Sequence, residues 1–366
     1  MGTKVWIRVL LATALSLAAA ACQPPSRRAQ GRPPHSMERS LVGAAWDDPL
    51  RCAAAVGAGA ALPRSHYRLR LATWSLSWFP DGAADHVQGE GSNVDWLACV
   101  LAWLDVDVVT LQRLRLTSRG LVAMDGLLTK LKETTHVEWR WQGDTCAGSK
   151  RAHVAVLWRV DRVQVSLVAS HPEIDVSPHT DTEHPDCPGE LMPALGLYVK
   201  SLMGGVDFHL VTFELAAGEN LLSLKRRQQA WRQIGAVVQA RERLREDSDV
   251  VIAAAFSSVG SRDPERYTSM AEREELTKTL AESEHPLVLV EPADSCTEYA
   301  GSEARETDFM VVSAGMQEAK GLTPRVGGLC GGLHCQSVDR DAYVVLRQIS
   351  SHCPLLFDLN DRDEDE

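Results

Sequence analysis

The chain has 366 residues, of which 45% are hydrophobic and 24% are charged. This composition is typical of a soluble globular protein with one large domain or two ordinary ones, and it excludes a disordered or polytopic chain. Lys and Arg number 38 against 49 Asp and Glu, so the net charge of −11 gives no sequence-wide basic field to attract a nucleic-acid backbone. General nucleic-acid binding is therefore not expected, although a local basic patch stays open.

The N-terminus has the pattern of an export signal over residues 1–21. Lys4 and Arg8 precede an apolar run from Val9 to Ala21. As a helix this run is about 20 Å long, which is too short for a hydrocarbon core of about 30 Å. The small residues before Cys22 resemble a bacterial lipobox, so we expect cleavage before Cys22 and its acylation. Cleavage without a lipid stays open. The signal predicts a protein of the bacterial cell envelope, lipid-anchored in the periplasm or at the surface, or secreted.

Eight cysteines remain beyond Cys22, and an even number in an exported protein favours disulfides over free thiols. The pairing is undecided from one sequence. Cys330 and Cys335 beside His334 could also be zinc ligands, which an oxidising compartment disfavours. The eight are Cys52, Cys99, Cys146, Cys187, Cys296, Cys330, Cys335 and Cys353.

Residues 22–65 are rich in Pro, Arg, Ala and Gly without a sustained hydrophobic period, which predicts a flexible linker. Between residues 66 and 360, β-type runs alternate with helical ones, which predicts one layered domain of the α/β or α+β type. The acidic run at 361–366 predicts a solvated tail. We expect helices at 94–104, 121–132, 221–245 and 264–280, and strands at 68–76, 105–112, 136–142, 153–160, 163–170, 205–215, 249–256 and 343–349.

Five segments carry a resemblance to a known family. They are LATWSLSWFPDG with DVDVVTLQRLR (71–82 and 105–115), DFHLVTFELAAGENLLSLKRRQQA (207–230), DVVIAAAFSSVG (249–260), CTEYAG with RETDFMVVS (within 296–313), and ISSHCPLLFDL (349–359). In order along the chain, they resemble the landmarks of the endonuclease/exonuclease/phosphatase superfamily, the fold of pancreatic-type deoxyribonuclease. The resemblance implies an α+β four-layer sandwich, in which two facing mixed β-sheets are flanked by helices and the active site lies at one end of the sheets.

The resemblance also implies a metal-dependent phosphoester hydrolase site, because such hydrolysis needs a divalent cation on oxygen ligands to neutralise the phosphoryl charge. Where the family has an Asn and a Glu as metal ligands, this sequence has Ser75 and Arg113. A guanidinium cannot ligate a cation and repels it. The remaining replaced positions are Glu214 for a His, Ala255 and Ser257 for an Asp and an Asn, and Ser351 for an Asp.

Asp308 and His352 match the family pattern, which pairs them so that the carboxylate fixes the tautomer of the imidazole. A lone base contributes about 10²–10⁴-fold to a rate, which is too little for phosphodiester hydrolysis without a metal. A structural hydrogen bond is the simpler interpretation of this retained dyad. If the fold brings Arg113 and Glu214 together, we expect them to form an ion pair where the family holds its metal.

We therefore hypothesise a pseudoenzyme without a cofactor that binds or scaffolds at the cell envelope. Its expected partners are the membrane, through the lipid anchor, and an unknown protein or phosphate-containing ligand. One alternative is an active Mg²⁺-dependent phosphodiesterase, nuclease or phosphatase with replacement ligands such as Glu214. The other is a metal-free phosphate-binding module in which Arg113, Ser75, Ser257 and His352 hold an anion.

Two further patterns have simpler interpretations. The segment 171–189 is rich in His and Asp, but its spacing matches no standard zinc pattern, so we expect a solvated loop. Trp96 and Trp103 are seven residues apart on one expected helix and therefore share a face, which favours core packing over a stacking surface for sugars or bases. The sequence contains no G-x-S-x-G nucleophile motif and no P-loop.

Overall fold

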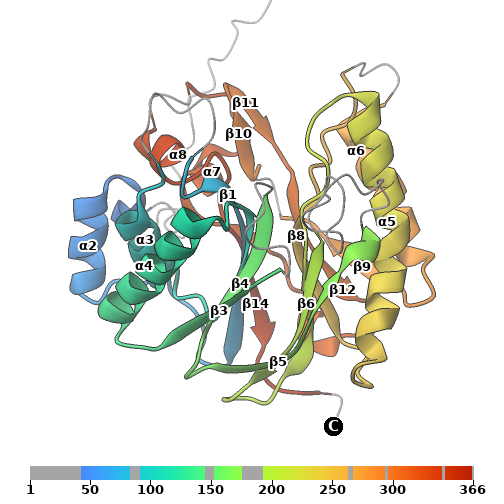
Figure 1. The fold of residues 1–366 in the computed structure, drawn as a ribbon, viewed down its shortest axis with the longest axis horizontal. Coiled ribbons are helices and arrows are strands. Elements are labelled where there is room, and N and C mark those ends of the chain that lie inside the picture. Colours follow the sequence, from blue (N-terminus) through green and yellow to red (C-terminus); the bar gives the residue numbers. More distant parts are fainter. Residues whose placement is uncertain are drawn as a thin grey trace, which may run out of the picture. The chain divides into compact units, whose positions relative to one another are not determined.

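Two six-stranded β-sheets face each other, with helices on their outer sides (Figure 1). This computed structural model describes residues 43–82, 91–144, 152–174, 193–262, 267–292, 296–339 and 343–364. All of them belong to one unit of the chain. The architecture confirms the predicted four-layer α+β sandwich.

The first sheet has the order β13-β14-β1-β2-β4-β3. Its central pair, β1 and β2, is parallel, whereas β14 joins β1 and β4 joins β2 in antiparallel fashion. The strands are β1 (Arg68–Phe79), β2 (Val108–Leu114), β3 (Trp139–Gly143), β4 (His153–Arg159), β13 (Arg325–Val326) and β14 (Leu355–Asn360).

The second sheet has the order β5-β6-β7-β8-β12-β9, and its central pair, β7 and β8, is again parallel. A separate hairpin of β10 (Glu298–Ala300) and β11 (Glu303–Arg305) lies beyond one end of the sheets (Figure 1). The strands of the second sheet are β5 (Val163–His171), β6 (Ala194–Ser201), β7 (Asp207–Thr212), β8 (Val250–Ala255), β9 (Leu287–Val290) and β12 (Asp308–Ser313).

The helices cover the sheets on both outer faces. In Figure 1, α2 (Pro49–Gly57), α3 (Val94–Leu104) and α4 (Ser118–Thr135) lie on one side, and α5 (Leu221–Glu242) and α6 (Ser269–Ala281) lie on the other. The N-cap residues of helices α3 to α6 each accept a hydrogen bond from a backbone N–H of the first turn. They are Asn93, Thr117, Asn220 and Thr268. The remaining short helices are α7 (Gly328–Leu333), α8 (Val344–Gln348), η1 (Ala44–Trp46), η2 (Pro172–Ile174) and η3 (Gln317–Ala319).

The apolar core has two parts. One fills the space between the two sheets and under α2 to α4, and it includes Trp74, Trp96 and Trp103, as expected for the two tryptophans of α3. The other lies between the second sheet and the helices α5 and α6, around Trp231. A buried ion pair between Arg227 of α5 and Glu272 of α6 joins these two helices to each other.

Three sequence predictions are wrong in part. Residues 43–65 are not a linker: Asp48 caps α2, Pro49 opens it, and Cys52 is buried. Residues 344–348 form helix α8 instead of a strand, because Val345, Leu346 and Ile349 then face the core together. The acidic end is not wholly solvated, since Asp361 is buried and its backbone N–H donates to Tyr67 O.

Three disulfides join the described cysteines: Cys52–Cys99, Cys296–Cys335 and Cys330–Cys353. They confirm the disulfide prediction for six of the eight cysteines, and Cys146 and Cys187 lie outside the described residues. The zinc interpretation of Cys330 and Cys335 is wrong, because both sulfurs are in disulfides with other partners. The residues of the export signal and Cys22 also lie outside the described ranges. No helix within those ranges is both long and apolar enough to cross a membrane.

Removing the Cys330–Cys353 disulfide is expected to lower the free energy of unfolding by about 3 kcal/mol, because the bridge closes a loop of 23 residues in the unfolded chain. Urea unfolding of a Cys330→Ala/Cys353→Ala variant, followed by tryptophan fluorescence, measures this loss. A Cys52→Ala/Cys99→Ala variant, whose bridge spans 47 residues, should lose slightly more. Losses below 1 kcal/mol in both variants would contradict the loop-closure argument.

Candidate functional site

The residues singled out from the sequence meet at one end of the sandwich because of its topology. Arg113 is near the end of β2, Glu214 follows β7, and Ala255 ends β8, so the carboxyl ends of parallel strands bring them to the same edge. Asp308 begins β12, which is antiparallel to β8 and pairs with it at Ala255. His352 precedes β14, which is antiparallel to β1.

His352 is held between two carboxylates. Its Nδ1 lies 2.9 Å from Asp308 Oδ2, and its Nε2 lies 3.3 Å from Glu298 Oε1. The His352 and Asp308 side chains are each 1% exposed. The His352 backbone carbonyl accepts a 2.8 Å hydrogen bond from Trp74 Nε1, which fixes the segment against β1. Asp308 and His352 are therefore in contact, as the family pattern implies.

Glu298 was missed by the sequence reasoning, which noted the segment CTEYAG without giving this residue a role. It lies on β10, next to the segment that bears His352: Glu298 and His352 form an isolated antiparallel bridge. The Cys353 N–H also donates to Thr297 O, and the Tyr299 N–H donates to Ser351 O. The sequence offers one signal for this role of Glu298: it is an acid in a short polar segment before the strand of Asp308.

Arg113 and Glu214 form an ion pair, with Arg113 Nε donating to Glu214 Oε1. The Glu214 side chain is 4% exposed and that of Arg113 is 18% exposed. Arg113 has a left-handed backbone with φ of 57°, and the pairing of β2 with β4 is irregular between Leu111 and Leu114. A non-glycine residue in this conformation is strained and is often found at functional sites. The irregularity turns Arg113 towards Glu214.

The serines of the site take part in a compact hydrogen-bond network. Ser77 Oγ lies 3.1 Å from both Ser350 Oγ and Ser351 Oγ, and Ser350 Oγ donates to Ser75 O. Ser75 Oγ is buried without a hydrogen-bond partner. Ser257, also in a left-handed conformation, donates its backbone N–H to Thr307 O. Ala255 is buried within β8 and brings no polar side chain.

Burial and the surrounding charges shift the pKa values in this cluster. Burial by itself lowers the pKa of His352, but the carboxylates of Asp308 and Glu298 outweigh it and raise the pKa to about 10. Burial raises the pKa of Glu298, but His352 and Arg113 lower it to about 2. Burial raises the pKa of Glu214, and Arg113 offsets this in part. Burial lowers the pKa of Arg113, which Glu214 and Glu298 more than reverse.

The stability of the protein should depend on pH through His352. Its folded-state pKa of about 10 lies above the ordinary 6.5, so its contribution is fully present below pH 6.5 and is lost as the pH rises towards 10. Glu298, with a pKa lowered from 4.5 to about 2, contributes above pH 4.5 and loses this as the pH falls towards 2. Urea unfolding of the wild type and His352→Gln between pH 6 and 10 measures the first effect. Parallel curves would contradict it.

The residues present do not fit a magnesium ion. Arg113 and the protonated His352 place two positive charges in contact with the carboxyl groups that would have to serve as ligands. Within the described residues, no three His, Cys, Asp or Glu side chains are arranged to hold a metal ion. Among the described residues, four buried oxygen atoms lack a hydrogen-bond partner, namely Ser75 Oγ, Gln112 Oε1, Glu214 Oε2 and Asp308 Oδ1. The two carboxylates among them are already paired with Arg113 and His352 through their other oxygen atoms.

Solved structures share this architecture. An endonuclease/exonuclease/phosphatase protein from Bacteroides vulgatus matches with a TM-score of 0.52 and 14% identity over 80% of this chain and 98% of its own. A family member from Bacteroides thetaiotaomicron matches with a TM-score of 0.51 and 16% identity, over 82% of this chain and 96% of its own. The chain has the endonuclease/exonuclease/phosphatase fold. A mannosyl-6-phosphatase from Bacteroides thetaiotaomicron also matches, with a TM-score of 0.51 and 16% identity, over 80% of this chain and 99% of its own. No family model and no curated protein matches the sequence.

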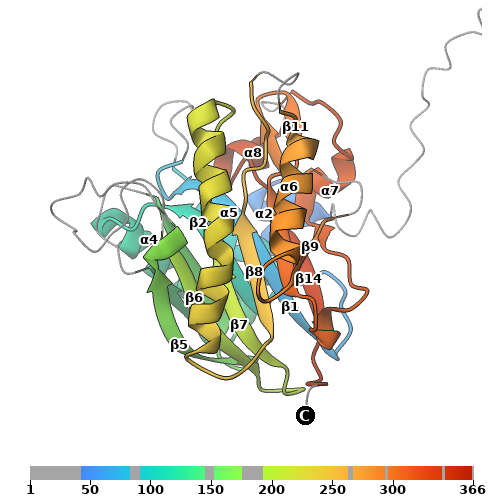
Figure 2. The same cartoon turned by 90° about the vertical axis from the view of Figure 1, so that its right-hand side faces the viewer.

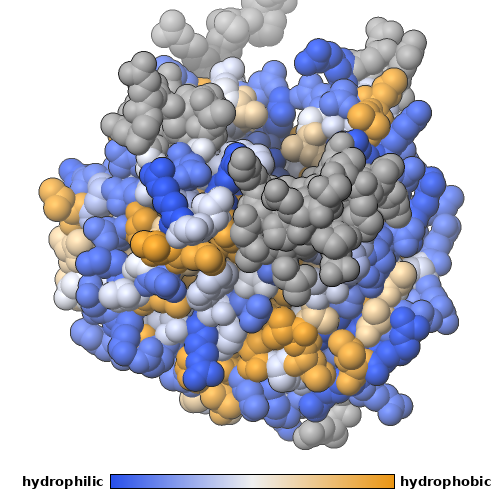
Figure 3. All heavy atoms as spheres, viewed as in Figure 1, coloured by the Kyte–Doolittle hydropathy of each residue, from blue (hydrophilic) through white to orange (hydrophobic). Residues whose placement is uncertain are grey.

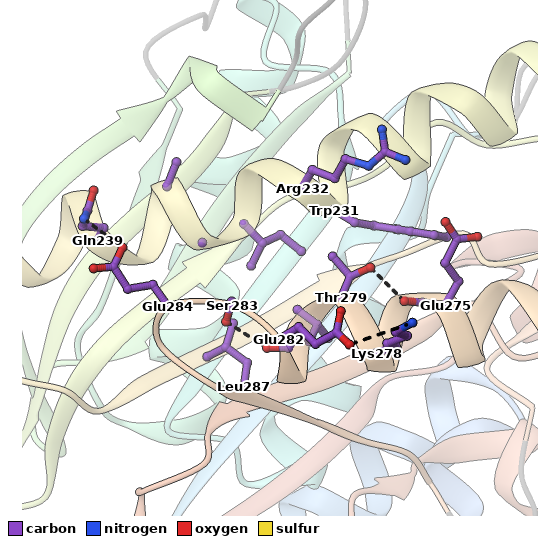
Figure 4. A pocket seen from close by; sticks show the side chains of 14 residues that line it. Trp231, Arg232, Gln239, Glu275, Lys278, Thr279, Glu282, Ser283, Glu284 and Leu287 are labelled. Atoms are coloured by element: carbon purple, nitrogen blue, oxygen red, sulfur yellow. Dashed lines mark hydrogen bonds and ion pairs between the residues drawn. The ribbon is translucent and has the colours of Figure 1, made fainter.

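Cavities among the described residues lie outside the ion cluster. A groove of about 650 Å³ runs between α5 and α6, lined by Trp231 and Gln239 on one helix and Lys278 and Thr279 on the other (Figure 4). Another cavity, of about 330 Å³, lies beside the β10–β11 hairpin and the start of α6, and one of about 400 Å³ is lined by Tyr198 and Arg245. Hydrophobic side chains form separate groups on a mostly hydrophilic surface (Figure 3). The segment 171–189 is described only as far as Ile174, so its predicted solvated loop lies outside the described residues.

Proposed function

We propose that this protein is a pseudoenzyme of the endonuclease/exonuclease/phosphatase fold, without metal-dependent phosphoester hydrolysis, that acts by binding or scaffolding at the cell envelope. The observation that carries the proposal is the ion pair between Arg113 and Glu214 beside the Glu298–His352–Asp308 chain. The family resemblance assigns metal ligands to positions near this cluster, so the two protein cations there support the proposal. The fold itself is of the phosphoesterase type.

The dyad of Asp308 and His352 supports a structural role in this proposal. A general base must accept a proton near neutral pH, and an imidazole with a pKa of about 10 is already protonated there. Its Nε2 also faces Glu298 instead of open solvent, and both members of the dyad are buried. We infer that the pair holds the start of β12 to the segment before β14, and that Glu298 adds the β10 hairpin through its contact with His352.

The metal-free phosphate-binding alternative receives less support from the geometry. Arg113 already donates to Glu214, and the carboxyl groups of Glu298 and Asp308 lie in the same cluster. Three carboxyl groups around two cations repel a phosphate, so a tight phosphate complex would need at least one of them to be protonated. We therefore keep binding of a partner, and not of phosphate at Arg113, as the proposed activity.

Export to the envelope is the second part of the proposal. Three disulfides among the described residues support an oxidising compartment, since such bonds are rare in the cytosol. The export signal at residues 1–21 and the acylation of Cys22 remain sequence predictions. Mass spectrometry of the protein from a bacterial membrane fraction tests them: a diacylglyceryl group on Cys22 supports the lipid anchor, and an unmodified N-terminus at Cys22 contradicts it.

The loss of hydrolysis is tested with the mature protein. Calorimetric titration with Mg²⁺, Mn²⁺ and Ca²⁺ is expected to give no binding heat, and bis-nitrophenyl phosphate is expected to stay intact with each cation. Turnover that requires both a cation and His352, and that disappears in a His352→Ala variant, would establish the active alternative instead. Stabilisation by phosphate that is lost in Arg113→Ala would establish the phosphate-binding alternative.

A further inference from the structure

Arg241 is a buried cation without a partner. It lies at the end of α5 and is 0% exposed, yet among the described residues its Nε, Nη1 and Nη2 all lack a hydrogen-bond partner. No carboxylate of the described residues forms an ion pair with it. Burial lowers the pKa of Arg241 to about 10, so the side chain remains charged at neutral pH. An uncompensated buried charge is strongly unfavourable, and folded proteins pair such groups.

The position of Arg241 is set by Gly196 of β6. A Cβ atom at Gly196 would lie 2.7 Å from Arg241 Cδ, 3.0 Å from Arg241 Nε and 2.9 Å from His171 Nε2. The absence of a side chain at Gly196 therefore makes room for the guanidinium stem and the imidazole side by side. Helix α5, which bears Arg241, crosses over β6 and β7 on the outer face of the second sheet (Figure 2).

The polar groups around Arg241 leave its charge uncompensated. His171 Nδ1 lies 3.0 Å from Glu173 Oε1, so this carboxylate is engaged by the imidazole. His209 Nε2 donates to Arg245 O, and burial lowers the pKa of both His171 and His209, which favours their neutral forms. His171 Nε2 and His209 Nδ1 are themselves buried without partners.

We propose that Arg241 is the binding group of a buried site for a small inorganic oxyanion, such as phosphate or sulfate, between α5 and the second sheet. The planar guanidinium presents two parallel N–H donors that match two oxygens of an oxyanion. A chloride ion is a single acceptor atom and does not match this pair of donors. The bound anion neutralises Arg241 and strengthens the packing of α5 on β6. The site is in the outer layer and is separate from the Arg113 cluster at the end of the sheets.

The test is thermal unfolding of the full mature protein in a phosphate-free and sulfate-free buffer, with inorganic phosphate as the probe and NaCl at matched ionic strength as the control. Phosphate at about 100-fold above its Kd is expected to raise the Tm by about 5 °C, while NaCl does not. Arg241→Met is expected to lose this response, and Arg243→Met, an exposed arginine on the same helix end, is expected to keep it. Calorimetry of the wild type should give one phosphate per chain.

The stability of Arg241→Met without anions separates the proposal from its alternatives. Removing an uncompensated buried cation should leave the variant at least as stable as the wild type in phosphate-free buffer. A large loss of Tm in every buffer would mean that another group of this chain pairs with Arg241, and it would overturn the proposal. A phosphate response that persists in Arg241→Met, or that vanishes in Arg113→Ala alone, would also overturn it. If Arg241→Met does not fold, calorimetry of the wild type is the test: the absence of a heat of phosphate binding would overturn the proposal.

Discussion

Replacing Arg227 with methionine is expected to lower the free energy of unfolding by about 3–5 kcal/mol. Arg227 and Glu272 are both fully buried, and the guanidinium bonds both carboxylate oxygens. Arg227 Nη1 also donates to Ala216 O at 2.9 Å and to Gly218 O at 2.8 Å. The variant leaves the Glu272 carboxylate buried without a counterion and leaves these carbonyl groups unpaired, which explains the size of the loss.

Urea unfolding of Arg227→Met beside Arg232→Met measures this effect. Arg232 lies on the same helix and is exposed, so its replacement should change the free energy of unfolding by about 0.5 kcal/mol or less. A double variant, Arg227→Met/Glu272→Met, should recover part of the loss because it removes the uncompensated charge. An Arg227→Met protein as stable as the Arg232→Met protein would show that this pair does not hold α5 to α6.

Replacing Arg113 with glutamate is expected to make the protein both less stable and responsive to divalent cations. Without cations, we expect a loss of about 3–5 kcal/mol, because Glu214 loses its guanidinium partner and gains an acidic neighbour close to Asp308 and Glu298. Added Mg²⁺ or Mn²⁺ should restore part of this loss, by about 2.7 kcal/mol at 100-fold above its Kd. Carboxylates that converge without a positive side chain between them are the ligands that Mg²⁺ prefers.

Thermal unfolding with and without Mg²⁺ tests this for the wild type, Arg113→Glu and Arg113→Gln. The glutamine variant loses the ion pair without adding an acid, so it should be destabilised and should not respond to the cation. The wild type should not respond either. Equal stabilisation of all three proteins by Mg²⁺ would mean that the ion binds elsewhere or that Arg113 does not block it, and the proposed loss of the metal site would be wrong.

The regular parts of the fold could be predicted from the sequence because local patterns specify them. The apolar run of α3 and the β-branched runs of β2 and β8 are where the hydrophobic pattern places them. The N-terminal helix α2 was missed although the signals were present: Asp48 as N-cap, Pro49 at the first turn and several alanines, which favour helices. The low complexity of this segment predicts a linker, but its residues form a helix with a buried cysteine.

The features that the sequence does not predict depend on contacts between residues far apart in the chain. The segment at 344–348 has the residues of a strand, but the packing of Val345 and Leu346 against the core selects a helix. Glu298 contacts His352 through a pairing of two short segments far apart in the sequence, which no local pattern encodes. The meeting of Arg113 with Glu214 could be expected because the fold resemblance places both at the same sheet end. The isolation of Arg241 depends on three separate elements and had no sequence signal.

The disulfide between Cys330 and Cys353 also determines what a single cut in the polypeptide would do. A protease that cleaves within α8 would separate the last strand, β14, from the preceding chain, but β14 pairs with both β13 and β1. The covalent bridge from α7 to Cys353 would keep the released fragment attached. The nicked protein would therefore migrate as one species on a gel without reductant and as two species after reduction.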